Sequence, residues 1–288
     1  VRARREPFDA VAALKQASPE TEALLAALND AGVSMDVHGL KQLGAVLMKL
    51  EFALPRQIEQ QSERLFSPTG RKLVPIVRAH RGKPGWDKLL AFWRAKVLVE
   101  HYNMDPSFMY ELMARFGPMD WRHPASHAIY WSAMGVKRVN RGPRNEDIDL
   151  INTDRQVIHG LQMLMRRGQI NLEPMRGELA LLPDPRFIPG YEKAVFSAER
   201  RARMQQEGEA EMFEAGHENF LQDAVVNLYL YGDVDQARHY FEEKLKKRYG
   251  DEPSNRREGL YELPLSQFVA VRLQEDVNVR QATARSTR

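Results

Sequence analysis

Apolar residues recur every three or four positions along most of the chain, which is the spacing of helices that bury one face. A capping residue followed by proline opens three of these segments, and glycine closes several others. The predicted helices cover residues 19–31, 35–53, 56–65, 86–102, 106–116, 124–134, 154–167, 189–207, 213–228, 235–249 and 265–277. Residues 169–172 and 178–182 favour a small β-hairpin. The sequence therefore predicts an all-α fold of antiparallel helix pairs with one such hairpin.

The helical pattern breaks between residues 67 and 85, where prolines and glycines fall among basic residues. This composition predicts a linker or long loop. It separates an N-terminal helical segment, residues 1–66, from a helical array over residues 86–250. Residues 251–288 are expected to form a C-terminal extension that is disordered after Gln281.

The last helix pair, residues 208–249, resembles a tetratricopeptide repeat. The resemblance rests on Gly232-Asp233-Val234-Asp235-Gln236-Ala237, followed by Tyr240-Phe241 and Leu245. A small alanine lets paired helices approach closely, while the aromatic residues and leucine fill the groove against the next helix. The first helix departs from the family, because Leu221, Ala224, Val225 and Leu228 stand where it prefers Trp, Leu, Gly and Tyr. The resemblance implies an array that binds other proteins.

A second resemblance covers the middle of the chain. Asp120-Trp121-Arg122-His123-Pro124 continues into His127-Ala128-Ile129-Tyr130-Trp131, and this run is similar to uncharacterised helical proteins of planctomycete-type bacteria. That group implies no particular activity. It does imply an N-terminal membrane or export segment, which agrees with a chain that begins at Val1 and leads to an expected association with the cell envelope or a membrane.

Composition excludes several kinds of chemistry. The 288 residues include no cysteine, so disulfides, thiolate metal sites and a cysteine nucleophile are ruled out. No run of 18 apolar residues occurs that could span a bilayer. The 42 Lys and Arg residues nearly balance the 39 Asp and Glu residues, so bulk charge does not favour nucleic acid as a partner.

The aromatic middle of the chain is the first candidate binding site. Asp120, Trp121, Arg122, His127, Tyr130 and Trp131 cluster in the sequence. If His127, Tyr130 and Trp131 share one helix face, they form an aromatic wall with Arg122 nearby. Such a wall could hold a peptide or stack on a ring. In the alternative interpretation the tryptophans wedge neighbouring helices, and Asp120 and Arg122 pair with each other.

A basic segment is the second candidate. Residues 137–144 contain Lys137, Arg138, Arg141 and Arg144 without an acidic neighbour, and they are expected to form a loop after a helix that Gly135 ends. The loop could contact phosphate, lipid headgroups or an acidic partner, or it could be ordinary surface.

Catalytic and metal-binding patterns are weak. His123 and His127 lie one helical turn apart but have no third ligand nearby in sequence, and His123 occupies a capping position. Asp154 and His159 have no serine elbow to complete a triad, so Asp154 is interpreted as the N-cap or a first-turn acid of its helix.

The sequence thus predicts a non-catalytic interaction or scaffold subunit of a larger assembly, without a cofactor, whose partners are other protein subunits. A small-molecule substrate is not expected. The alternatives are a metal-assisted hydrolase that uses the histidines of the middle segment, and a binder of RNA or anionic lipid through residues 137–144.

Overall fold

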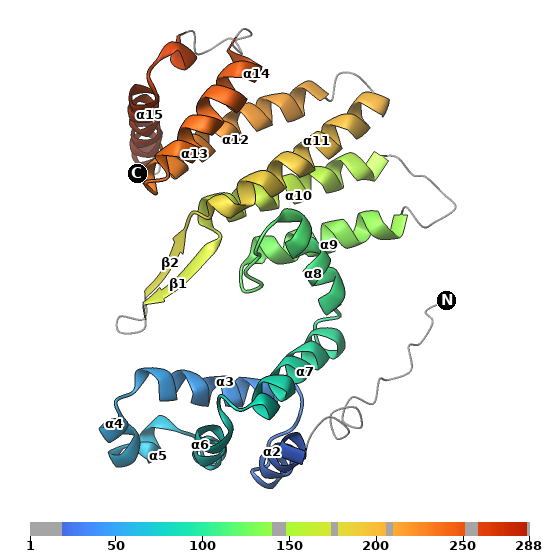
Figure 1. Cartoon of the computed structure of the whole chain (residues 1–288), viewed down its shortest axis with the longest axis vertical. Coiled ribbons are helices and arrows are strands. Elements are labelled where there is room, and N and C mark those ends of the chain that lie inside the picture. The colour runs from blue at the N-terminus through green and yellow to red at the C-terminus, as the bar shows by residue number, and fades with distance from the viewer. Residues whose placement is uncertain (1–18, 140–147, 174–177, 206–209, 251–258, 287–288) are drawn as a thin grey trace. The chain divides into compact units, whose positions relative to one another are not determined.

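The computed structural model describes residues 19–139, 148–173, 178–205, 210–250 and 259–286 (Figure 1). Contacts divide these residues into two compact units. Unit 1 comprises the described residues up to Tyr110, and unit 2 comprises those from Glu111 onward. The boundary falls inside one helix, α8 (Pro106–Phe116). The predicted all-α fold with a small β-hairpin is confirmed.

Unit 1 is a group of helices around a core that contains Leu24, Leu43, Leu73 and Trp93, all at most 1% exposed. The indole N–H of Trp93 donates to the backbone carbonyl of Asp36 at 2.9 Å, which ties this core to the start of α3. The helices of unit 1 are α2 (Pro19–Asp30), α3 (Val37–Phe52), α4 (Pro55–Gln60), α5 (Ser62–Leu65), α6 (Pro68–His80) and α7 (Pro84–Glu100), followed by the start of α8.

The prediction of a linker or long loop over residues 67–85 is wrong, because Pro68–His80 is helix α6. Ser67 caps this helix by accepting a hydrogen bond from the backbone N–H of Gly70 at 3.1 Å. Pro68 occupies the first helical position, where a missing N–H has no cost. Leu73 and Val77 are buried on one face, so the helix is held by its apolar stripe despite its glycine and proline content.

Gly39 and Gly44 of α3 offer a matched test of packing in unit 1. A Cβ on Gly39 would lie 1.9 Å from the carbonyl oxygen of Ser34 and 3.0 Å from Cζ2 of Trp93, whereas one on Gly44 meets nothing within 4 Å. Gly39→Ala is expected to lower the free energy of unfolding by about 1–3 kcal/mol. Gly44→Ala should raise it by roughly 0.5–1 kcal/mol, because alanine favours helix. Urea denaturation followed by circular dichroism checks both, and equal effects would contradict the packing.

Unit 2 stacks its helices largely in chain order (Figure 1). Helix α10 packs against α9 and α11, α11 packs against α12, and α12 packs against α13 and α15. The elements are the end of α8, α9 (Pro124–Val139), α10 (Ile148–Arg167), β1 (Gln169–Glu173), β2 (Glu178–Leu182), the 3₁₀ turn η1 (Pro185–Phe187), α11 (Ile188–Gln205), α12 (Ala210–Leu230), α13 (Val234–His239), a π-helical segment (Tyr240–Lys246), α14 (Lys247–Tyr249), the 3₁₀ turn η4 (Leu260–Glu262) and α15 (Leu265–Ser286).

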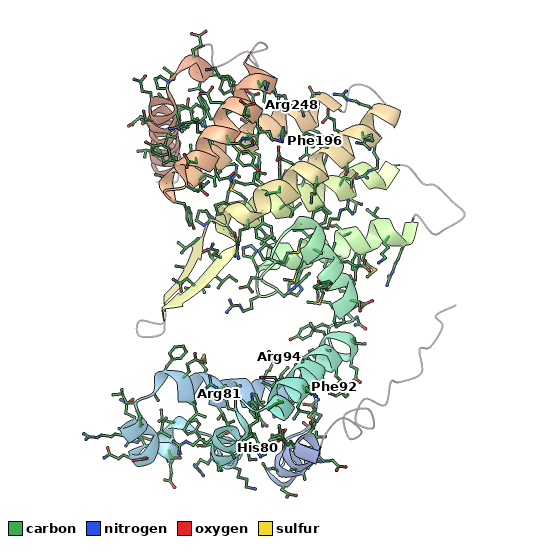
Figure 2. The ribbon with its side chains drawn as sticks, viewed as in Figure 1. His80, Arg81, Phe92, Arg94, Phe196 and Arg248 are labelled. Atoms are coloured by element: carbon green, nitrogen blue, oxygen red, sulfur yellow. The ribbon has the colours of Figure 1, made fainter. Side chains whose placement is uncertain are left out.

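Aromatic stacking and ion pairs join α11 to α12 and to α14 in unit 2. The rings of Tyr191 and Phe220 are nearly parallel, with centroids 3.5 Å apart, and join α11 to α12. Arg248 lies 5.1 Å from the ring centroid of Phe196 (Figure 2) and pairs with Glu199 at 3.2 Å. Glu199 is only 8% exposed, so this carboxylate depends on its arginine partners.

The last helix pair buries three of the residues that suggested a repeat, Ala237, Phe241 and Leu245, each 0% exposed. Its second helix contains the π-helical segment, which a regular helical repeat lacks. Helix α15 continues to Ser286, so the prediction of disorder directly after Gln281 is wrong. No helix in the described part of the chain is both long and apolar enough to cross a membrane.

Candidate functional site

The turn between α8 and α9 brings the predicted aromatic residues together. The ring of Trp121 makes edge contacts with His127 and Tyr130, at centroid distances of 6.4 and 6.2 Å. Trp131 in turn lies edge-on to Tyr130 at 5.0 Å. These four residues form one cluster, which we call the aromatic cluster.

The aromatic cluster is partly core and partly surface. Tyr130 is 1% exposed and packs inside unit 2, whereas Trp131 is 45% exposed. The indole N–H of Trp121 donates to Sδ of Met113 at 3.3 Å, and Nε2–H of His127 donates to the carbonyl oxygen of Trp121 at 2.7 Å. These two bonds hold Trp121 against α8 and α9. The cluster is therefore an ordered part of the packing and not an open wall of four rings.

Arg122 extends from the same turn and is held by Asp120. Its Nε lies 3.0 Å from Oδ1 of Asp120 and its Nη2 lies 2.5 Å from Oδ2. The backbone N–H of Arg122 also donates to Oδ1 at 2.9 Å. The hydrogen bonds from Arg122 lower the pKa of the Asp120 carboxyl below its usual value. Arg122 remains 68% exposed, so the guanidinium is oriented but open to solvent.

A second turn with the same geometry precedes η1. Asp184 accepts a 2.8 Å hydrogen bond from Nε of Arg186 on Oδ1 and a 2.7 Å bond from Nη2 on Oδ2. The backbone N–H of Arg186 donates to Oδ1 at 3.2 Å. The side chain of Asp184 is 2% exposed while that of Arg186 is 63% exposed. The paired carboxylate raises the pKa of Arg186, which keeps the guanidinium charged.

Both Asp-x-Arg turns line one pocket in unit 2, with a volume of about 630 Å³. The hairpin supplies another part of the wall, where Gln169, Asn171 and Leu182 share one face by strand register. The chemistry of the pocket is therefore two anchored guanidinium groups, two side-chain amides and the apolar surfaces of Trp121 and Leu182. A volume of this size fits a small ligand or a few residues of a peptide.

Sequence reasoning found Trp121 and Arg122 but missed the partners that complete the pocket. Asp184, Arg186 and the hairpin residues lie far along the chain from the turn. The signal that could have found them is the repetition of Asp-x-Arg, in Asp120-Trp121-Arg122 and in Asp184-Pro185-Arg186.

The prediction of a basic loop over residues 137–144 is wrong for its first two residues. Lys137 and Arg138 belong to the last turn of α9, which continues past Gly135. Lys137 pairs with Glu111 at 2.8 Å, so the segment has an acidic neighbour in space that its sequence lacks. Arg138 is exposed, whereas Arg141 and Arg144 lie outside the described residues.

The residues considered for metal or catalytic chemistry have structural contacts. Nδ1 of His123 accepts the backbone N–H of Ala125 at 3.1 Å and caps α9. Asp154 is neither an N-cap nor a first-turn acid, because α10 begins at Ile148. It is mostly buried, and both its oxygens accept hydrogen bonds from Arg201 at 2.7 and 2.8 Å. Within the described ranges, no group of three or more His, Asp or Glu side chains is arranged to hold a metal ion.

A buried polar cluster joins α11, α12 and the π-helical segment. Nε2 of His217 and Oε1 of Glu192 lie 3.8 Å apart, and Lys244 approaches the same oxygen at 3.5 Å. Burial raises the pKa of Glu192, but His217 and Lys244 outweigh it and hold the pKa below its usual value. His217 is 1% exposed, so this cluster offers no open site.

A scan of the chain against protein-family models finds no match, and neither do searches of curated proteins and of solved structures. The resemblances to tetratricopeptide repeats and to planctomycete-type proteins therefore stay predictions.

The cap formed by His123 predicts a pH dependence of stability. Burial lowers the pKa of His123 in the folded state, so protonation favours the unfolded chain. The stability that this residue contributes is present above the unfolded-state pKa, near 6.5, and is lost as the pH falls through the lowered value. His123→Asn keeps a capping acceptor without a titrating group, and it should flatten this part of the profile.

The measurement is the free energy of unfolding of wild type and His123→Asn from urea titrations between pH 7.5 and 5 (about one half-unit apart). We expect the difference between the two proteins to change in favour of the variant as the pH falls. Parallel profiles across this range would show that the ring does not titrate against the fold.

Proposed function

We propose that this chain is a non-catalytic interaction subunit whose hairpin and adjoining pocket hold a segment of a partner protein. One observation carries the proposal, namely that β2 exposes three leucines within four residues. Leu179 is 61% exposed, Leu181 is 41% exposed and Leu182 is 39% exposed. Exposed apolar side chains gathered on one short strand are typical of an interaction surface.

The hairpin also offers backbone groups to a partner. Its sheet has two strands within the described residues, so each strand has an outer edge without a neighbouring strand. Extended segments of other proteins bind such edges by adding a strand, with main-chain hydrogen bonds for affinity and side-chain pockets for specificity. Ile170 and Leu181 face each other across the sheet and present an apolar surface beside that edge.

The aromatic cluster supports this site. Trp121 forms part of the pocket wall and is held by Met113 and His127, so a bound segment meets a surface that is already ordered. A preordered surface lowers the entropic cost of binding. The contacts of His123 and Asp154 are those of a cap and an ion pair, which favours binding over catalysis as the role of this region.

Selection from a phage-displayed library of random peptides on the immobilised full chain tests the proposal. Wild type should enrich a family of peptides, and the double variant Leu179→Ser/Leu181→Ser should lose that enrichment. Leu179 and Leu181 lie on the face of β2 opposite the pocket face of Leu182, and a strand added at the edge of β2 contacts both faces with alternate side chains. Leu230→Ser is the matched control, since Leu230 is 60% exposed at the end of α12 and outside the hairpin. Failure of wild type to enrich peptides, or equal enrichment on the hairpin variant, would refute the proposal.

A further inference from the structure

The two Asp-x-Arg turns present donors of the same kind to one pocket. In each turn the aspartate accepts from Nε and Nη2 of the guanidinium, and neither Arg122 nor Arg186 donates a hydrogen bond from Nη1 within the described part of the chain. An arginine carries five N–H donors, so N–H groups remain on each residue for another acceptor. The aspartates fix both planes and lower the entropic cost of using them.

The charge of the pocket limits which ligand groups can accept hydrogen bonds from these arginines. Arg122 and Arg186 are balanced by Asp120 and Asp184, and the other lining side chains are neutral. A polyanion gains chiefly from net positive charge, which is cancelled here. A single carboxylate gains from directed, charge-assisted hydrogen bonds, which anchored guanidinium groups supply.

The remaining lining points to a carboxylate on a peptide. The amides of Gln169 and Asn171 can bond main-chain N–H and C=O groups, and the side chains of Trp121 and Leu182 can contact an apolar residue. From these contacts we infer that the segment of the partner protein is acidic. An Asp, Glu or C-terminal carboxylate of this segment binds the open N–H groups of Arg122 and Arg186, next to an apolar residue on Trp121 and Leu182. This inference rests on the proposed function and names the chemistry of its partner.

A cycle between peptide and protein variants tests the inference with the full chain. Peptides selected from the random library are synthesised, and each acidic residue is replaced by its amide, Glu by Gln or Asp by Asn. Affinities are measured by isothermal titration calorimetry on wild type and on Arg122→Gln. This variant leaves Asp120 with access to water, because its side chain is 23% exposed. Arg186→Lys is the second variant, because it keeps a charge beside the buried Asp184 while removing the planar fork.

We expect the selected peptides to share an acidic position, and its amide replacement to weaken binding to wild type about tenfold. On Arg122→Gln the acidic and amide peptides should bind within about twofold of each other, and Arg186→Lys should narrow the difference in the same direction. Arg200→Gln serves as control, because Arg200 is exposed on α11 and does not line the pocket, and it should leave the tenfold difference intact.

Other outcomes separate this inference from the proposed function. Selected peptides without an acidic position, still lost on the Leu179→Ser/Leu181→Ser variant, would overturn the inference and leave the proposed function standing. An absence of selected peptides would overturn both. Inorganic phosphate that displaces the acidic peptide with equal affinity would overturn the inference in favour of a phosphate ligand.

Discussion

The buried carboxylate of Asp184 is the constraint on which the pocket depends. Its backbone N–H donates to the carbonyl oxygen of Met165 near the end of α10 at 2.7 Å, and its side chain caps the 3₁₀ turn that leads into α11. A carboxylate that is 2% exposed needs a charged partner, and Arg186 is that partner. The hairpin leaves α10 at Gln169 and returns at Leu182, so these bonds hold both of its ends. The bonds to Asp184 also hold the Arg186 guanidinium in the wall of the pocket.

Most of the fold follows from local signals in the sequence. The start of α8 at Pro106 and the glycine turn at Gly232 could be predicted, because capping residues, proline and left-handed glycine act within one turn of the chain. Composition misled at residues 67–85. There a count of glycines and prolines hid the apolar period of Leu73 and Val77, which packing in unit 1 turns into a helix.

In the candidate site, too, contacts between residues near in sequence could be predicted and tertiary contacts could not. The contacts of Trp121 with His127 and Tyr130 join residues near in sequence, from the turn before α9 to its second turn, so a cluster of these residues could be suggested from the sequence. Gly135 misled, because glycine ends a helix when it adopts a left-handed conformation, and Gly135 has no positive φ. The placement of the two Asp-x-Arg turns around one pocket is set by tertiary structure. It depends on how α10 and the hairpin place η1, which no local pattern encodes.

Each arginine of the pocket is paired with its own aspartate, so the pocket has strong hydrogen-bond donors but no net charge. The chain as a whole has the same balance, with 42 basic and 39 acidic residues, so long-range attraction contributes little to partner choice. Discrimination must then arise at contact distance, where hydrogen-bond direction and apolar area decide. For the partner segment that we propose, this balance implies selection by the order of its acidic and apolar residues, because Leu182 and Gln169 are paired across the hairpin at fixed register. Total charge alone would not select it.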